Sequence, residues 1–189
     1  NALLGNSGQT VTYMPTPEVV PSEQHAAMRQ LVVDMDAGRV QALLIVGEAN
    51  PVFTAPADWK FAEALQKVAW RAHTGLFHDE TAELCQWHVP STHYLEMWSD
   101  ARSFDGTVSI VQPLIAPIYD GRSITEMLAA INGNSARGMD LVKAYWTRAF
   151  NGQTKVAWTL RDTGGQPFLN GDVFWRHALH DGFVAGTSR

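Results

Sequence analysis

The stretch "LLIVGEANPVFTAPAD", residues 43–58, decides the fold of this 189-residue chain. Its branched apolar residues run almost without interruption to Gly47, and the sequence then turns polar at once. A near-continuous apolar run is typical of a strand that is buried on both faces of a parallel sheet. An Asn50–Pro51 turn follows, and a helical pattern begins after Pro56. The stretch therefore predicts a strand, a loop and a helix in succession.

The same alternation continues on both sides of that stretch. A helix is predicted from Ser22, a good N-cap residue, to Gly38, which suits the position after a last turn. Apolar residues at helical spacing predict a second helix over 61–68, and a short helix or turn is expected in "DETAELC". Strands are expected near residues 42–47, 69–74 and 86–89. This β-α-β-α-β order predicts an α/β fold, a three-layer α/β/α sandwich with a mostly parallel sheet.

The chain beyond Pro90 shows a different pattern. "TVSIVQPLIAPIY" is apolar but broken by two prolines, so it is predicted to be extended and to lie over the domain. "SITEMLAAING" predicts a helix with a capping box of Ser123 and Glu126. We also predict a helix in "MDLVKAYWTRAF", a strand and turn in "KVAWTLRDTGGQPF", and a helix from Asp172 to near His180. A first domain is expected over 1–120, with a C-terminal helical and extended extension over 121–189 packed on it.

Composition excludes several classes of protein. The chain is 46% apolar and 17% charged, which is typical of a globular domain. A net charge of −5 argues against nucleic acid or an anionic membrane as the main partner. No apolar run reaches the roughly 20 residues of a spanning helix. The single cysteine, Cys85, excludes an internal disulfide and an iron–sulfur cluster held by this chain alone.

The tip of the first strand, residues 47–54, is the first candidate site. Ligands of open parallel sheets lie beyond the carboxyl ends of the strands. Gly47 lets the backbone approach a ligand, Asn50 offers an amide, and Pro51 stiffens the turn. An ordinary strand-to-helix connection explains the same residues. Neither of the glycine patterns that bind phosphates occurs here.

A second candidate is the polar segment "HDETAELCQWHVPSTHYLE". Four of its residues are of types that bind zinc, but their spacing fits no standard zinc site. These residues are Cys85, His88, His93 and Glu96. Histidines that simply lie in loops are the simpler interpretation of the segment. Asp79, Glu80 and Glu83 offer carboxylates for acid–base chemistry, although the first two also suit a helix N-terminus. No nucleophile motif is present, and His177 and His180 simply share a helix face.

Four longer segments together resemble a known family. "NALLGNSGQTVTY", "LLIVGEANPVFTAPAD", "DETAELCQWHVPSTHYLEMWSDARSFDG" and "VSIVQPLIAPIYDGRS" are similar to the molybdopterin oxidoreductase (dimethyl sulfoxide reductase) superfamily. Within it, they look like the large iron–sulfur subunit of alternative complex III, a quinol-oxidising respiratory complex. The resemblance implies a Rossmann-like domain, a fragment of a much larger subunit.

The resemblance also assigns roles to individual residues. In active relatives the loop that matches Gly47, Asn50, Pro51 and Thr54 contacts a molybdopterin guanine dinucleotide. The "ETA" segment at Glu80 and Thr81 belongs to the same motif, and its alignment places Gly75 where relatives have an aspartate that pairs with guanine. A glycine offers no side-chain acceptor to the guanine N–H donors. The resemblance thus implies vestigial cofactor contacts, no cofactor in this chain, and iron–sulfur clusters in other domains of the subunit.

Three functions follow as hypotheses. The first is a cofactor-free scaffold in a periplasmic respiratory complex, docked on other domains and on membrane and haem subunits without entering the membrane itself. The second is the molybdopterin guanine dinucleotide-binding domain of an active oxidoreductase. The third is a stand-alone nucleotide-binding or zinc-dependent module. We also expect an exposed apolar surface near "VQPLIAPIY" or the C-terminal helix, through which the chain self-associates.

Overall fold

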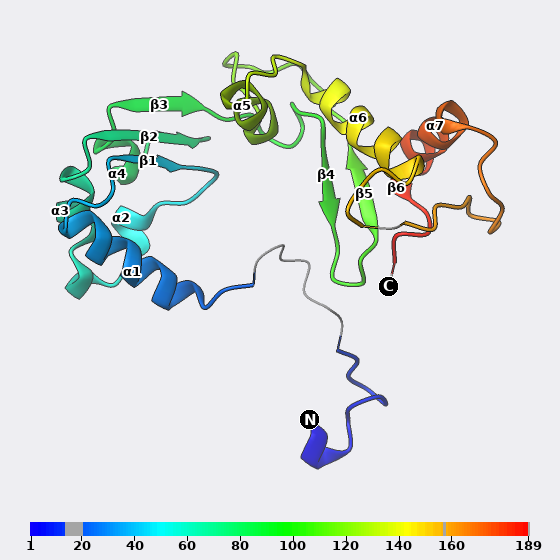
Figure 1. Cartoon of the computed structure of the whole chain (residues 1–189), viewed down its shortest axis with the longest axis horizontal. Helices are drawn as coiled ribbons and strands as arrows, with labels where there is room; N and C mark the ends of the chain where they lie inside the picture. Colours follow the sequence, from blue (N-terminus) through cyan, green and yellow to red (C-terminus); the bar gives the residue numbers. More distant parts are fainter. Residues whose placement is uncertain (14–20, 157, 189) are drawn as a thin grey trace. The chain divides into compact units, whose positions relative to one another are not determined.

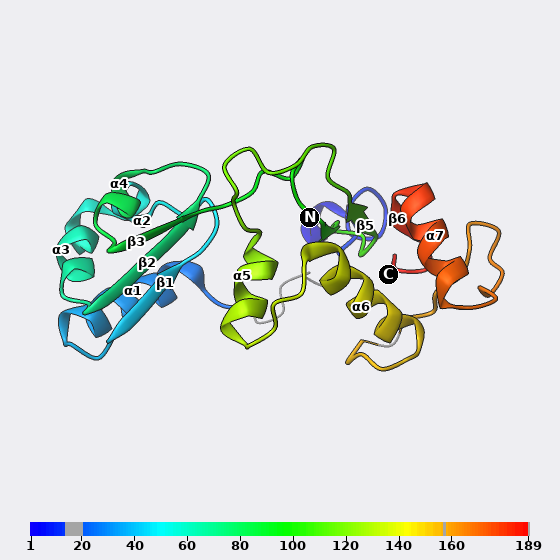
Figure 2. The ribbon, with the colours of Figure 1, turned by 90° about the horizontal axis from the view of Figure 1, so that it is seen from above.

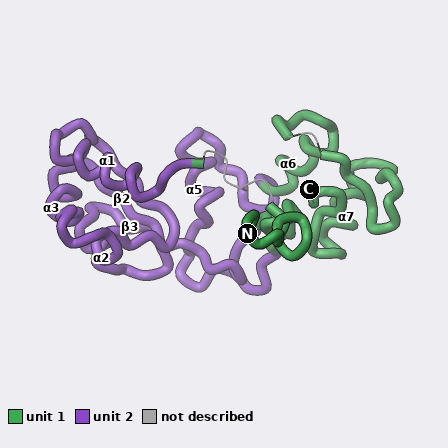
Figure 3. Tube along the Cα trace, turned by 90° about the horizontal axis from the view of Figure 1, so that it is seen from below, with its two compact units in different colours: residues 1–21, 99–111, 142–189 green, residues 22–98, 112–141 purple. Residues whose placement is uncertain are grey.

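The structure is a computed structural model, and it describes residues 1–13, 21–156 and 158–188. The chain divides into two compact units, which are coloured separately in Figure 3. Unit 2 comprises residues 22–98 and 112–141, and unit 1 comprises residues 1–21, 99–111 and 142–189. The predicted boundary at residue 120 stays a prediction.

Unit 2 is built on a three-stranded parallel sheet. Its strands are β1 (Ala42–Ile45), β2 (Trp70–Gly75) and β3 (Trp87–Pro90), in the order β1-β2-β3. The arrowheads in Figure 1 point the same way, so the carboxyl ends of all three strands lie at one edge of the sheet. Helices flank this sheet (Figure 2), which confirms the predicted Rossmann-like α/β fold with strands close to the expected positions.

Four helices of unit 2 connect or precede these strands. They are α1 (Gln24–Asp36), α2 (Pro51–Thr54), α3 (Phe61–Gln66) and α4 (Glu80–Glu83), with a 3₁₀ turn at Ala57–Trp59. A core forms where α1, β1 and α3 meet, and its fully enclosed members include Met35 and Leu65. The predicted N-cap of α1 was wrong. Glu23 caps the helix instead, because its carboxylate accepts from the backbone N–H groups of His25 and Ala26.

Strand β1 is less buried than its sequence predicts. It lies at the edge of the sheet, and only Ile45 is buried, whereas Leu43 and Leu44 are half-buried and Ala42 is exposed. The apolar run therefore predicted the strand correctly but not its place at the edge of the sheet. The burial of a strand depends on the elements that pack against it.

The rest of unit 2 is a long connection and one helix. Helix α5 (Ile124–Ile131) begins at Ser123 with the predicted capping box to Glu126. The preceding segment carries four exposed apolar side chains, Leu114, Ile115, Ile118 and Tyr119, as expected for "VQPLIAPIY". Self-association through this surface stays a prediction.

Unit 1 contains a small antiparallel sheet. Its strands are β4 (Ser99–Arg102), β5 (Val108–Val111) and β6 (Phe183–Val184), with β5 in the centre. Residues 108–111, predicted to be extended, thus form a strand that pairs with β4 along its length and with β6 at Val108 and Ser109. Helix α7 (Gly171–Asp181) ends at Gly182 as predicted, and a short 3₁₀ turn covers Ala2–Leu4.

Three further findings complete the comparison with the predicted elements. Helix α6 (Gly138–Phe150) agrees with its predicted position. The strand predicted in residues 155–168 was wrong for the described part of that segment, where Trp158 packs against Trp146 in place of strand pairing. In the described part of the chain no helix is long and apolar enough to cross a membrane.

Candidate functional site

The predicted loop residues meet at the carboxyl edge of the parallel sheet. Gly47 lies just beyond β1 with a φ of 79°, a value that favours glycine, and the chain turns there towards α2. Asn50 precedes α2, and Pro51 occupies the first helical position, where its missing N–H costs nothing. Thr54 closes the short helix by donating from its hydroxyl to the Asn50 carbonyl at 2.9 Å.

Asn50 joins this loop to the next strand-to-helix connection. Its Nδ2 donates to Glu80 Oε2 at 2.7 Å, and its Oδ1 accepts from the hydroxyl of Thr81 at 2.7 Å. Thr81 is fully buried, and its Oγ1 also accepts from the backbone N–H of Val52 at 3.1 Å. We call these contacts of Asn50, Val52, Glu80 and Thr81 the Asn50 clasp. It ties α2 to α4 with groups that the resemblance assigned to a cofactor.

The electrostatics of the clasp favour an ionised Glu80. The hydrogen bond from Asn50 holds the pKa of Glu80 below its ordinary value, and backbone hydrogen bonding acts in the same direction. Asp79 caps α4 by accepting from the Ala82 N–H at 2.9 Å, as expected for an acidic residue at a helix start. The two carboxylates therefore have structural partners.

Gly75 lies at the end of β2, next to the first strand. A Cβ built on it would lie 2.9 Å from Cε1 of His73 and 3.3 Å from the carbonyl oxygen of Gly47. The first of these distances is shorter than side chains tolerate, so an aspartate at position 75 requires His73 to move. At the position where the resemblance expects the guanine-binding aspartate, the chain thus has no side-chain acceptor, and an added Cβ would contact the ring of His73.

His73, which lies beside Gly75, belongs to a group of histidines that the sequence did not single out together. His73 and His88 are partners in the register of β2 and β3, and their Nδ1 atoms are 3.0 Å apart. The ring of His78 packs edge-on against His88 at 5.3 Å between centroids. Only the register of the two strands brings His73 and His88 together, and the sequence alone does not fix it.

The four zinc candidates do not assemble. His88 pairs with His73, and Glu96 accepts from the backbone N–H groups of His93 and Ile118. Cys85 packs against the core near α3, and burial raises the pKa of its thiol. Within the described residues no group of three or more side chains is placed to hold a metal ion.

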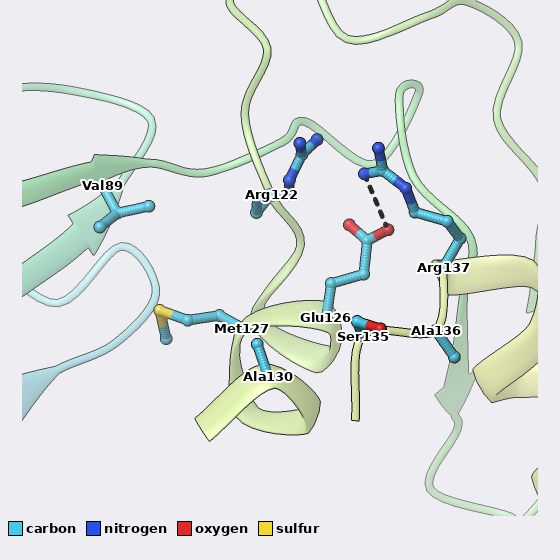
Figure 4. Close-up of a pocket in the computed structure, with 8 residues that line it drawn as sticks. All are labelled: Val89, Arg122, Glu126, Met127, Ala130, Ser135, Ala136 and Arg137. Carbon is cyan, nitrogen blue, oxygen red and sulfur yellow. Dashed lines mark ion pairs between the residues drawn. The ribbon is translucent and has the colours of Figure 1, made fainter. Parts of the chain in front are cut away.

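A hollow beside the end of β3 also lies at the carboxyl edge. A cavity of about 390 Å³ is lined by Val89, Met127 and two arginines, Arg122 and Arg137, with Glu126 between them (Figure 4). A second cavity of about 630 Å³ shares both arginines and Glu126. Glu126 is engaged by the backbone N–H of Ser123 and, at 3.1 Å, by that of Gly138, so it stabilises the turn into α6.

The histidines predicted on the C-terminal helix are neighbours as expected. His177 and His180 line a hollow of about 410 Å³ on α7 together with Val173 and Arg176. His180 contacts Asp181 at 2.8 Å, and His177 packs against Phe168. Neither histidine belongs to a group of potential metal ligands among the described residues.

Comparison with known proteins gives a partial relationship. No family model matches the chain. A menaquinone reductase, molybdopterin-binding-like subunit of Nitratidesulfovibrio vulgaris is 32% identical over 102 residues, which cover 52% of this chain and 14% of that protein. The chain thus spans about a seventh of this relative. The similarity supports, loosely, the expected relationship to molybdopterin oxidoreductase-like subunits.

Proposed function

We propose that this chain is part of a molybdopterin oxidoreductase-like subunit in a respiratory complex that exchanges electrons with a quinone, and that it acts there as a cofactor-free scaffold. The similarity to a menaquinone reductase, molybdopterin-binding-like subunit supports the subunit type and the quinone link. The Asn50 clasp supports the scaffold role, because both polar ends of the Asn50 amide are already bonded within the chain. The chemistry of electron transfer then belongs to other domains or subunits.

The clasp is the observation that carries this proposal. A loop that contacts a dinucleotide must present free donors and acceptors to it. Here the corresponding groups join α2 to α4, and the crowded Gly75 offers no acceptor. The finer assignment, to the large subunit of alternative complex III in the periplasm with membrane and haem partners, rests on the resemblance of the sequence segments.

The alternative is the cofactor-binding domain of an active molybdenum enzyme. It is favoured by the shape of the Gly47–Asn50–Pro51 turn at the carboxyl edge of a parallel sheet, which is where such folds bind ligands. The two proposals differ in one measurable property, which is the affinity of this edge for a guanine nucleotide.

Calorimetry with guanosine diphosphate tests the proposal. Loss of a charge-assisted pair to guanine costs about 2–5 kcal/mol, which is roughly 30-fold to several thousandfold in affinity. We expect no measurable binding by the wild-type chain. Gly75→Asp and Gly75→Asn form a matched pair that differs only in charge, and neither is expected to bind tightly because His73 occupies the space. A wild-type dissociation constant of about 1 μM or lower would overturn the scaffold proposal in favour of the alternative.

A further inference from the structure

Two arginines line the same cavity beyond the end of β3. Arg122 and Arg137 line the cavity of about 390 Å³ that Figure 4 shows, and both also line the larger one of about 630 Å³. The described residues that line these cavities all belong to unit 2. The backbone N–H of Arg122 donates to the carbonyl of Pro90 at 3.1 Å, which anchors it to β3. Both volumes lie in the range of about 300–1,000 Å³ that small-molecule sites occupy.

The carboxylate of Glu126 fixes the backbone beside each arginine. Its Oε2 accepts from the N–H of Ser123 and its Oε1 from the N–H of Gly138, each at 3.1 Å. These two residues directly follow Arg122 and Arg137 in the chain. One side chain thus holds the backbone of both arginines in place before a ligand arrives, and such preorganisation lowers the cost of binding.

Most N–H donors of the two guanidinium groups have no partner within the described residues. Each guanidinium carries five donors. That of Arg122 donates to Asp120 at 3.3 Å, and the Asp120 side chain is 91% exposed. That of Arg137 lies 4.0 Å from a carboxylate oxygen of Glu126, which is too long for a hydrogen bond. The two arginines therefore keep donors for a ligand.

The charges at the smaller cavity favour a ligand with a single negative charge. Among the described residues that line it, two arginines face one carboxylate, that of Glu126, which leaves one net positive charge. The larger cavity also contains Glu96, whose pKa is held below its ordinary value by hydrogen bonds from the N–H groups of Ile118 and His93. The anionic end of a ligand therefore belongs at the smaller cavity, because electrostatic complementarity selects the partner there.

The remaining walls are mostly apolar. Val89 and Met127 line the smaller cavity, and Met97 and Ile115 line the larger one. The larger cavity also contains Thr92, which is 5% exposed and whose hydroxyl has no hydrogen-bond partner among the described residues. Buried hydroxyls are normally paired. Because this oxygen is enclosed, a ligand would bond to it only after the side chain turns to another rotamer.

We propose that Arg122 and Arg137 form a binding site for a small organic carboxylate with an apolar body. Guanidinium groups bind a planar carboxylate through paired, charge-assisted hydrogen bonds. The apolar walls then cover the body of the ligand. None of these residues belongs to the Asn50 clasp, and the site goes beyond the proposed scaffold role, which requires no ligand.

NMR titration of the chain with benzoate tests the site. The reporters are the backbone amides of Arg122 and Gly138, and the Val108 amide in unit 1 is the internal control. Both reporters should shift saturably with a dissociation constant of about 1 mM, while the control does not. Benzamide, a neutral molecule of the same shape, should not bind. Phenylphosphate, which carries close to two negative charges at neutral pH, should not bind more tightly than benzoate.

Three substitutions assign the contacts. Arg137→Gln, at a 66% exposed side chain, should leave the fold intact and weaken benzoate binding by about tenfold or more. Arg148→Gln is the matched control, because it removes the same charge from an exposed arginine of α6 that lines neither cavity, and the affinity should not change. Asp120→Asn should strengthen binding by up to about fivefold, because it removes the charge that competes for Arg122. Asparagine tolerates the φ of 50° at this position.

Three results would overturn the proposal. They are reporters that do not shift at about 10 mM benzoate, equal binding of benzamide and benzoate, and equal losses of affinity in Arg137→Gln and Arg148→Gln. Tighter binding of phenylphosphate than of benzoate would contradict the assignment of the ligand as a carboxylate.

Discussion

The Asn50 clasp makes a quantitative prediction about stability. Asn50→Ala removes the acceptor of the Thr81 hydroxyl, which donates to Oδ1 at 2.7 Å. Thr81 is fully buried, so its hydroxyl depends on partners within the chain. A buried donor left without a partner costs about 1–3 kcal/mol. We expect Asn50→Ala to lower the free energy of unfolding of unit 2 by this amount, and the contact between α2 and α4 to loosen first.

Two further variants isolate the cause. Asn50→Asp keeps the acceptor for Thr81 but places a carboxylate against that of Glu80, which now accepts from Nδ2. Its destabilisation should therefore be larger at neutral pH than at a pH where these carboxylates are protonated. Thr54→Ala is the matched control, because it removes an exposed hydrogen bond from the Thr54 hydroxyl to the carbonyl of the same Asn50. It should lower the free energy of unfolding by less than about 1 kcal/mol.

Native-state hydrogen exchange is the suitable assay, because the two units need not unfold together. Exchange of the amides of β2 reports the free energy of unfolding of unit 2, and exchange of the Val52 amide reports the clasp itself. A change of less than about 0.5 kcal/mol in the β2 amides of Asn50→Ala would show that Thr81 finds another partner, and the reasoning would fail.

Two predictions concern unit 1. Asp100→Ala should destabilise it by about 1–3 kcal/mol. The Nε1–H of Trp146 donates to Asp100 Oδ2 at 2.8 Å, and the Trp146 ring is 1% exposed, so the substitution leaves this N–H unpaired. Asp100→Asn keeps an acceptor and should cost less, and equal losses in urea unfolding would contradict this explanation. Gly186→Ala should cost more than Gly182→Ala in thermal unfolding. Both positions have positive φ, which penalises alanine by about 1–2 kcal/mol. Only at Gly186 does the added Cβ meet a backbone atom, the Thr159 carbonyl oxygen, and comparable melting temperatures would argue against that clash.

The sequence alone determined the local elements of this protein. The apolar run to Gly47, the Asn50–Pro51 turn and the helical spacing after it predicted the β-α-β-α-β order, and Ser123 with Glu126 predicted the start of α5. These features are local, because a cap or a periodic face is fixed by residues three or four apart. The predicted tip residues also lie together, since parallel strands end at one edge, while their role toward a cofactor stays a prediction.

Only the tertiary structure decided how these elements meet. The pairing of β6 with β5 joins residues 183–184 to 108–109, and no local pattern identifies such distant partners. The edge position of β1 likewise depends on strand order and not on its own apolar residues. Register placed His73 against His88, and the approach of α4 to α2 used the polar groups of Asn50 within the chain. The physical reason is that side-chain periodicity fixes which face a residue occupies, whereas the partner on that face is set by long-range packing.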